Sequence, residues 1–220
     1  MIAETYTAQD FANEVDVSRE TFEAFSQWHA LLLKWNRKIN LVSPTALNSF
    51  WQRHALDSWQ VTRHLRPEDY KILDLGSGAG FPGLALAIHM KQKNNVTTNA
   101  KTVFHVKLVE SAGKKANFLR TVIRELNLPA SVWAGRAEDL EALPYDVISA
   151  RAFAPLPRLL TYAQPFWGAT TQALLLKGQS VDSELTEAEK SWTFDITSSP
   201  SHSHEGGSLL SLTALRAKPE

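Results

Sequence analysis

The sequence contains no cysteine. This absence excludes disulfide bonds, thiol nucleophiles and zinc sites built on cysteine, and it fits a reducing compartment. No apolar run approaches the roughly 20 residues that a membrane-spanning helix needs. The acidic start, MIAETYTAQDFANEVD, has neither the positive segment nor the apolar segment of a signal peptide. Together these absences predict a cytoplasmic protein without a membrane partner.

The chain also lacks a net charge, because 23 basic residues balance 23 acidic ones. The signs are nevertheless segregated: residues 1–30 hold six acids and one base, whereas residues 31–66 hold six bases and one acid. A basic segment beside an acidic one would present a positive face to nucleic acid. Ordinary solvated helix faces produce similar counts. Charge alone therefore leaves both interpretations open.

Two kinds of hydrophobic pattern divide the 220 residues. Helical spacing covers 18–40 and 45–65, with a break at Ser43-Pro44. Beyond Pro67, short apolar runs alternate with helical stretches, which predicts a mostly parallel α/β sheet with helices on both faces. We therefore expect an N-terminal helical extension, 1–66, packed on a core, 67–220. The seven strands are expected at 71–76, 103–111, 130–135, 145–151, 172–178, 192–197 and 208–216.

Four further helices are expected between these strands, near 82–92, 112–128, 156–166 and 182–191. The last two strands lie close together in the chain and are expected to form an antiparallel hairpin. The polar segment 91–102 carries no periodic pattern and predicts a loop.

The stretch ILDLGSGAGFPG (72–83) is an apolar strand followed by a glycine-rich turn. Such turns receive ligands at the carboxyl ends of parallel strands, where a following helix start favours anionic groups. A phosphate-binding P-loop would end in Gly-Lys-Ser/Thr, and this turn has no lysine. The dinucleotide spacing is present as Gly78, Gly80 and Gly83. The spacing acid-x-Gly-x-Gly-x-Gly is present as well, in Asp74, Gly76, Gly78 and Gly80.

This second spacing resembles the first motif of Rossmann-like methyltransferases that bind S-adenosylmethionine. An acid at Asp74 would repel a pyrophosphate but would accept hydrogen bonds from the cofactor's ammonium, directly or through water. Glu110 ends the second strand, where this class holds both ribose hydroxyls, although an acid there suits NAD as well. Ala137 and Glu138, after the third strand, are candidates for the border of the adenine. Acids are also favoured in a first helical turn, so Glu138 has a purely structural alternative.

Several segments together resemble one family, the small-subunit (16S) ribosomal RNA methyltransferase G family (RsmG, also called glucose-inhibited division protein B, GidB). They span about residues 30–180 and keep the family's order: LLKWNRKINLVS (32–43), RHALDS (53–58), DLGSGAGFPG (74–83), ESAGKKANFLR (110–120), ISARAFAPL (148–156) and LLKGQ (175–179). The resemblance implies a Rossmann-like class I fold and methyl transfer from S-adenosylmethionine to N7 of a guanine in 16S rRNA. It also carries cofactor contacts onto Gly76, Phe81, the Ala137–Glu138 pair and Arg151. The expected partner is 16S rRNA within the 30S subunit, and the expected state is a monomer.

Guanine N7 has a free lone pair and needs no deprotonation before it attacks a methyl group. We therefore expect no catalytic base and no metal, and rate enhancement through alignment of the reactants. His54 is interpreted as a packing or surface residue. Arg151 is the candidate for positioning the target guanine. The residues expected to contact RNA are Arg53, Lys114, Lys115, Arg151 and Lys177.

Two other functions stay open at this point. One is methyl transfer to a small molecule or a protein, which the basic segment 31–66 disfavours. The other is a module that binds RNA or cofactor and has kept the fold without catalysis. Methyl incorporation into ribosomal RNA would distinguish an rRNA methyltransferase from both alternatives. Absence of S-adenosylmethionine binding would favour the module over either enzyme.

Overall fold

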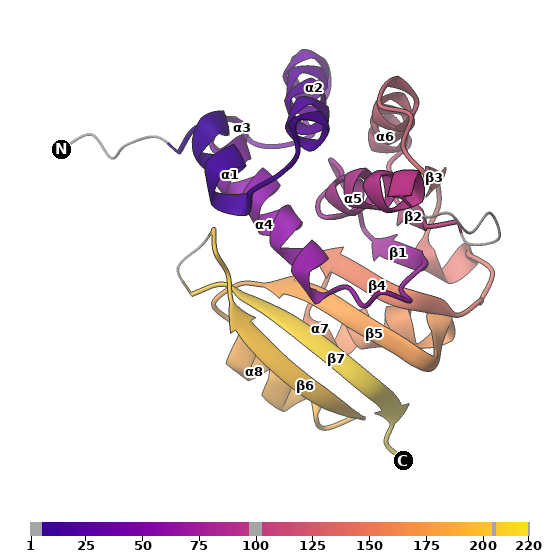
Figure 1. The fold of residues 1–220 in the computed structure, drawn as a ribbon. Helices are drawn as coiled ribbons and strands as arrows, with labels where there is room; N and C mark the ends of the chain where they lie inside the picture. The colour runs from indigo at the N-terminus through magenta and orange to yellow at the C-terminus, as the bar shows by residue number, and fades with distance from the viewer. Residues whose placement is uncertain (1–5, 97–102, 204–205, 220) are drawn as a thin grey trace.

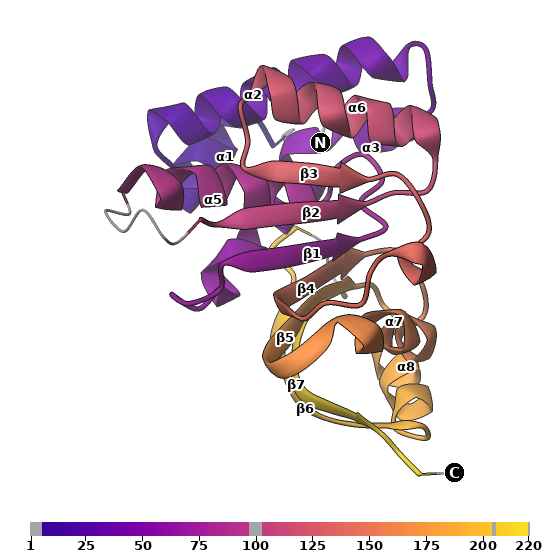
Figure 2. The ribbon, with the colours of Figure 1, turned by 90° about the vertical axis from the view of Figure 1, so that its right-hand side faces the viewer.

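The computed structural model describes residues 6–96, 103–203 and 206–219, and these ranges contain one seven-stranded mixed sheet (Figures 1 and 2). The strand order is β3-β2-β1-β4-β5-β7-β6. Neighbours among β1 to β5 are parallel, whereas β7 runs antiparallel to both β5 and β6. The strands are β1 (Lys71–Leu75), β2 (His105–Val109), β3 (Ala130–Trp133), β4 (Tyr145–Arg151), β5 (Trp167–Lys177), β6 (Trp192–Pro200) and β7 (Ser208–Ala217).

Helices cover both faces of the sheet, and each face has its own apolar core. On one side lie α5 (Gly83–Val96) and α6 (Gly113–Glu125), and on the other lie α7 (Leu156–Ala163) and α8 (Val181–Ala188) (Figure 1). Side chains alternate along β1, so that Ile72 joins the first core and Leu73 joins the second. This is the Rossmann-like α/β arrangement that the sequence predicted.

The N-terminal segment adds a helical layer over α5 and α6 (Figure 2). Trp28 is fully buried, and its ring lies 4.8 Å from that of Phe81 in the glycine loop. This contact packs the extension directly against the turn that follows β1. The elements of the segment are α1 (Ala8–Val15), α2 (Arg19–Asn36), α3 (Pro44–Asn48), the π-helix η1 (Phe50–Leu56), α4 (Asp57–Trp59) and the 3-10 helix η2 (Gln60–His64).

Several element boundaries differ from the sequence prediction. Helix α2 ends at Asn36 and not at residue 40, because the Asn36 amide bonds the backbone of the following loop instead of continuing the helix. Strand β5 begins at Trp167, five residues before the predicted start. Helix α1, with its Thr7–Asp10 capping box, was not predicted. The predicted loop 91–102 is helical up to Val96, and its last six residues lie outside the described ranges.

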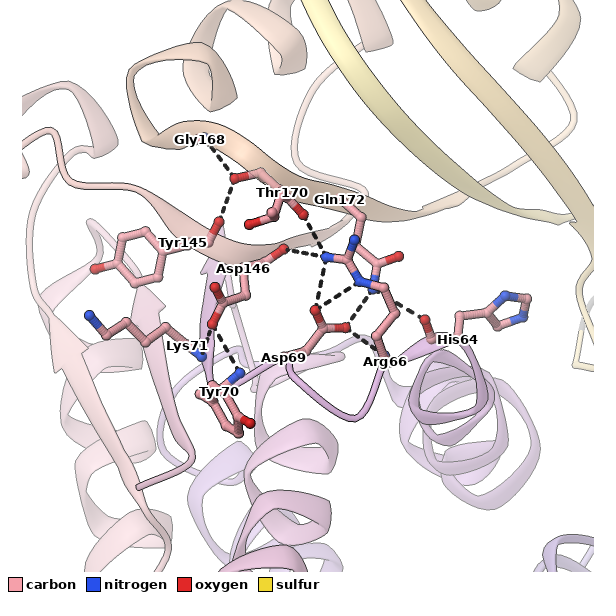
Figure 3. Close-up of polar contacts among 11 residues, drawn as sticks. His64, Arg66, Asp69, Tyr70, Lys71, Tyr145, Asp146, Gly168, Thr170 and Gln172 are labelled. Atoms are coloured by element: carbon pink, nitrogen blue, oxygen red, sulfur yellow. Dashed lines mark hydrogen bonds and ion pairs between the residues drawn. The ribbon is translucent and has the colours of Figure 1, made fainter. Parts of the chain in front are cut away.

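A polar network joins the end of the extension to the core strands (Figure 3). Arg66 forms an ion pair with the fully buried Asp69, at 2.9 Å, and donates to the backbone oxygens of Asp146 and Thr170. Gln172 of β5 donates to the same Asp69 carboxylate at 2.6 Å. The network therefore fixes the entry into β1 against β4 and β5. Within the described ranges, no helix combines the length and the apolarity needed to cross a bilayer.

Candidate functional site

A cavity of about 490 Å³ opens at the carboxyl ends of β1 to β4, and we call it the glycine-loop cavity. Strand order reverses between β1 and β4, so this is the switch point where open α/β sheets bind ligands. Four segments of the core form its wall: the glycine loop, the end of β2, the turn after β3 and the end of β4. Its lining includes Gly76, Gly78, Phe81, Glu110, Lys115, Ala137, Glu138 and Arg151.

The glycine loop needs backbone that only glycine adopts freely. Gly76, Gly78 and Gly80 all have positive φ, of 68°, 58° and 101°. A Cβ on Gly78 would meet only the Gly76 oxygen, at 3.8 Å, so this position is open toward the cavity. A Cβ on Gly80 would lie 2.3 Å from Leu84. Gly80 therefore serves packing against α5 and is not part of the lining, and its predicted cofactor contact stays a prediction.

Glu110 holds the end of β2 to the glycine loop. Its Oε2 accepts a hydrogen bond from the Gly78 N–H at 2.9 Å, and its Oε1 accepts one from the Ala112 N–H at 2.7 Å. The side chain is 8% exposed and lines the cavity. A carboxylate oxygen has more than one acceptor direction, so Glu110 can stabilise the loop and still receive a ligand hydroxyl.

The structure places Asp74 in the core, and its predicted contact with a ligand, direct or through water, stays a prediction. Asp74 is fully buried and lies behind the cavity wall. Its Oδ1 accepts from the Ser149 hydroxyl at 2.7 Å, and a Cβ on Gly83 would lie 2.4 Å from its Oδ2. Burial raises the pKa of Asp74 to about 6, against the effect of its hydrogen bonds. Asp74 therefore supports β4 and the start of α5 from inside the core.

A second cavity, of about 670 Å³, adjoins the first, and both share the wall Arg151–Phe153. We call it the hairpin cavity because the tip of the β6–β7 hairpin forms one of its sides, through Ser201, Ser203, Gly207 and Ser208. Arg53, His54 and Asp57 come from the extension, and Lys177 and Glu184 lie near the end of β5 and on α8. Ala152, in the shared wall, has a positive φ of 50°, a strained conformation that often occurs at functional sites.

The Arg151 guanidinium is held by three groups of the extension. Its Nη1 donates to the Arg53 carbonyl at 2.9 Å and to Asp57 Oδ2 at 3.2 Å, and its Nη2 donates to His54 Nδ1 at 2.8 Å. The guanidinium also lies over the Phe81 ring, 4.7 Å from its centroid. Arg151 thus lines both cavities with a fixed orientation.

His54 is a neutral acceptor in this arrangement. A guanidinium only donates, so Nδ1 of His54 carries no proton. Burial, followed by the charges of Arg151 and Arg53, lowers the pKa of His54 to about 3. Its ring stacks on Phe81 at 4.4 Å. These contacts support a packing and anchoring role.

Three cations line the hairpin cavity, and the two less exposed ones, Lys177 and Arg151, are paired. Lys177 lies 2.5 Å from Glu184 Oε2 and donates to the Ala154 carbonyl at 3.0 Å, with its side chain 8% exposed. Arg151 is paired with Asp57. The predicted RNA contacts thus separate: Arg53, Arg151 and Lys177 line the hairpin cavity, Lys115 lines the glycine-loop cavity, and Lys114 is exposed on α6 outside both linings.

Two parts of the site were missed by sequence reasoning. Leu41 and Val42 close one side of the glycine-loop cavity, in the connection between α2 and α3. The Asn36 amide holds them by accepting from both of their N–H groups and donating to the Val42 oxygen. The sequence held a signal for Leu41 and Val42, since both lie in LLKWNRKINLVS (32–43), one of the segments that resemble the family. No sequence signal singled out Ser201 and Ser203. Within the described residues, no group of three or more potential metal ligands lies close enough to hold an ion.

Comparison with known proteins gives one consistent family. The family model GidB, described as rRNA small subunit methyltransferase G, matches residues 21–209. A ribosomal RNA small subunit methyltransferase G from Rhodospirillum rubrum is 46% identical over 204 residues, which cover 93% of this chain and 96% of that protein. The protein of the same name from Rhodospirillum centenum is 44% identical over 214 residues, covering 97% and 93%.

Solved structures with low sequence identity share the fold. A TehB-like SAM-dependent methyltransferase from Corynebacterium glutamicum superposes with a TM-score of 0.53 at 14% identity, covering 86% of this chain and 98% of that one. A ribosomal protein L11 methylase from Lactobacillus delbrueckii gives a TM-score of 0.53 at 15% identity, covering 71% and 75%. Both are similar to this chain in its class I methyltransferase fold.

Proposed function

Because the chain belongs to the rRNA small subunit methyltransferase G family, we propose that it methylates N7 of a guanine in the 16S rRNA of the small ribosomal subunit, with S-adenosylmethionine as the methyl donor. The observation that carries the proposal is the pair of adjoining cavities that share the wall Arg151–Phe153. One cavity suits the donor and the other suits the acceptor base.

The glycine-loop cavity fits the donor in size and in chemistry. Its volume of about 490 Å³ lies within the range of about 300–1,000 Å³ for small-molecule sites. Gly78 leaves the loop open to a close approach. We propose that Glu110 receives the ribose hydroxyls, that Gly76 and Phe81 border the loop side, and that Ala137 and Glu138 border the adenine. When bound, the cofactor supplies an electrophilic methyl group on a sulfonium.

The hairpin cavity suits an uncharged base better than a phosphate. Its two less exposed cations are already neutralised, Arg151 by Asp57 and Lys177 by Glu184, and the third cation, Arg53, is exposed. A phosphate would need an unpaired positive charge, whereas a flat neutral base needs hydrogen-bonding groups and apolar wall. Single-stranded RNA is commonly recognised with its bases splayed out of the stack. We propose that the target guanine enters here.

The chain's residues would then contribute orientation to the reaction. The N7 lone pair attacks without prior loss of a proton, so no side chain has to act as a base. His54 does not act as a base in this step, since the lone pair of its Nδ1 accepts from Arg151. The fixed guanidinium and the strained backbone at Ala152 set the distance between the two cavities. Such alignment is itself a large contribution to rate.

Exposed cations around the mouths of the two cavities are proposed to contact phosphates. Arg53 and Lys115 each line one mouth, Arg136 lines the glycine-loop cavity, and Lys114 stands beside it at the start of α6. Since the whole chain carries no net charge, RNA binding depends on this local grouping. We further propose that the chain acts as a monomer on the 30S subunit.

The test is methyl transfer to defined subunits. The chain is incubated with methyl-labelled S-adenosylmethionine and 30S subunits that lack the modification, and the label is mapped in 16S rRNA. We expect one labelled guanine that carries the methyl on N7. Gly78→Asp serves as the control that should transfer nothing. Cofactor binding without any label in 16S rRNA would refute the proposal.

A further inference from the structure

Asp57 receives hydrogen bonds from two distant parts of the chain and from Gln60, three residues farther along. Its side chain is 12% exposed, and its Oδ2 pairs with Arg151 at the end of β4. Its Oδ1 accepts from Gln60 Nε2 at 2.9 Å, from the Ser201 hydroxyl at 3.1 Å and from the Ser203 hydroxyl at 2.8 Å. The carboxylate thus joins α4, β4 and the tip of the β6–β7 hairpin.

This arrangement fixes the direction of two hydroxyl groups. A serine hydroxyl has one proton and two lone pairs. An ionised carboxylate only accepts, so Ser201 and Ser203 both donate to Asp57, and the two hydroxyl oxygens also lie 3.2 Å apart, where either can donate to the other. The Ser203 N–H occupies one lone pair of Ser201 Oγ, at 3.2 Å. Both side chains line the hairpin cavity, where their hydroxyl oxygens can act only as acceptors.

Arg151, in the wall that the two cavities share, keeps N–H groups that can serve a ligand. Both N–H groups of Nη1 and one N–H of Nη2 are used by Arg53, Asp57 and His54. Among the described residues, the Nε–H and the second N–H of Nη2 take no partner. Arg151 lines both cavities, whereas the two serines line only the hairpin cavity. A ligand that extends from the shared wall toward the hairpin therefore meets donors first and acceptors second.

We propose that Asp57 determines base selectivity by holding Arg151 as a donor and Ser201 and Ser203 as acceptors. This pattern is complementary to a 6-oxopurine. Moving around guanine away from N7, the O6 acceptor comes first, and the N1–H and 2-amino donors follow. Adenine presents the reverse, an amino donor at C6 and an acceptor at N1. The inference rests on the proposed function, because it concerns the base whose N7 is methylated.

The test compares two target bases. Small subunits are reconstituted with 16S rRNA that carries either guanine or adenine at the position the chain methylates, and kcat/KM is measured for each. Both bases have an N7, so the comparison reports recognition. For the unmodified chain we expect guanine to be preferred by about 10-fold or more, the discrimination that a good pair of hydrogen bonds provides.

Two variants then separate recognition from folding. In Ser201→Ala/Ser203→Ala the acceptors are lost while the Arg151–Asp57 pair is kept. We expect the guanine preference to fall about tenfold, in a variant that still melts in one transition and keeps its affinity for S-adenosylhomocysteine, although the loss of two hydrogen bonds to Asp57 lowers its melting temperature. In Asp57→Asn, the amide nitrogen donates to the serines and turns their hydroxyls around, so the preference should fall at least as far. Ser198→Ala/Ser199→Ala, on the same hairpin but outside the lining, should keep it.

The outcomes are distinct. Equal loss of rate on both bases in the Ser201→Ala/Ser203→Ala variant, with the preference intact, would overturn the inference and leave Asp57 a structural residue. Preference for adenine or none in the unmodified chain would overturn it as well. Failure of the unmodified chain to methylate any 16S rRNA would instead count against the proposed function.

Discussion

Gly78 combines a left-handed backbone with an open side toward the glycine-loop cavity. Gly76 and Gly80 also have positive φ, but a Cβ on either would strike a neighbouring side chain, Phe153 or Leu84. Substitution at those two positions would therefore disturb packing first. Gly78 is the position of the three where a side chain tests the cavity with the least disturbance of the core.

We expect Gly78→Asp to abolish binding of S-adenosylhomocysteine, because the new carboxylate enters the cavity beside Glu110, whose Oε2 lies 2.9 Å from the Gly78 nitrogen. Gly78→Ala carries the same left-handed strain, about 1 kcal/mol, without the charge, and should bind more weakly than the unmodified chain. Titration calorimetry on the folded variants measures both. Unchanged affinity in folded Gly78→Asp would contradict the assignment of this cavity to the cofactor.

Asp74 offers a pH-dependent test of the buried carboxylate. Its folded pKa of about 6 exceeds the ordinary value of 3.8, so the folded chain binds this proton more tightly than the unfolded chain does. The protonated Asp74 carboxyl therefore adds to the free energy of unfolding. This contribution is complete below the pKa of the unfolded chain and is lost as pH rises through the pKa of the folded chain. Asparagine at this position keeps the shape and does not titrate.

The free energy of unfolding of Asp74→Asn, minus that of the unmodified chain, should therefore rise by about 2–3 kcal/mol between about pH 4 and pH 7. Urea unfolding of both proteins across this range measures the difference, in which other titrating groups cancel. A difference independent of pH would show that Asp74 keeps an ordinary pKa. Any activity change is a separate readout, because the variant leaves the cavity lining intact.

At the scale of elements, the connection between α2 and α3 determines how one side of the glycine-loop cavity closes. Its apolar members, Leu41 and Val42, are ordered by the Asn36 amide through three backbone hydrogen bonds. The π-helix η1 also orders a residue of the site, because the Arg53 carbonyl in it accepts a hydrogen bond from Arg151. Irregular helical turns of this kind recur at functional sites.

Asn36→Ala should weaken binding of S-adenosylhomocysteine by about tenfold, or about 1.4 kcal/mol, because the loop that closes the cavity loses its anchor. Asn94→Ala is a matched control. The Asn94 amide also accepts from and donates to a backbone, that of Phe104, before the start of β2 at the far end of the sheet. Both variants should lose about 1–2 kcal/mol of stability, but only Asn36→Ala should lose affinity. Equal affinities in calorimetry would contradict the proposed closure.

For the whole molecule, the extension and the core share buried surface and a buried ionic network. Trp28 packs on Phe81, and Arg66 pairs with Asp69 beside the proposed boundary at residue 66. We propose that 1–66 and 67–220 unfold as one unit, because separating them would expose fully buried aromatic side chains and leave Asp69 unpaired.

Trp28→Ala should lower the stability of the entire chain by about 3–5 kcal/mol while a single transition is kept. Scanning calorimetry together with far-ultraviolet circular dichroism tests this. Leu33→Ala, at a position on the same helix that is 40% exposed, should change stability by less than about 0.5 kcal/mol. Two transitions, with the later one at the original midpoint, would show that the extension unfolds independently of the core.

Some features of this protein follow from local pattern in the sequence alone. Strand and helix alternation, the glycine loop after β1 and the acid Glu110 at the end of β2 were all predicted, because each follows from periodicity or from residues adjacent in the chain. The family motifs are also runs of adjacent residues, and they favoured an rRNA methyltransferase over the other functions considered. The end of α2 was misplaced because the Asn36 side chain competes with the helix for backbone hydrogen bonds, and periodicity does not report such competition.

Which residues line the cavities, and which lie behind their walls, depends on contacts between distant segments and does not follow from local pattern. Asp74 belonged to the right motif, yet its side chain points to Ser149 and Gly83 in the core. The hairpin cavity depends on Asp57 meeting Ser201 and Ser203, more than 140 residues farther along the chain. Contacts at such separation arise when sheet order places β7 beside β5. Strand pairing therefore brings together residues whose local sequences carry no sign of one another.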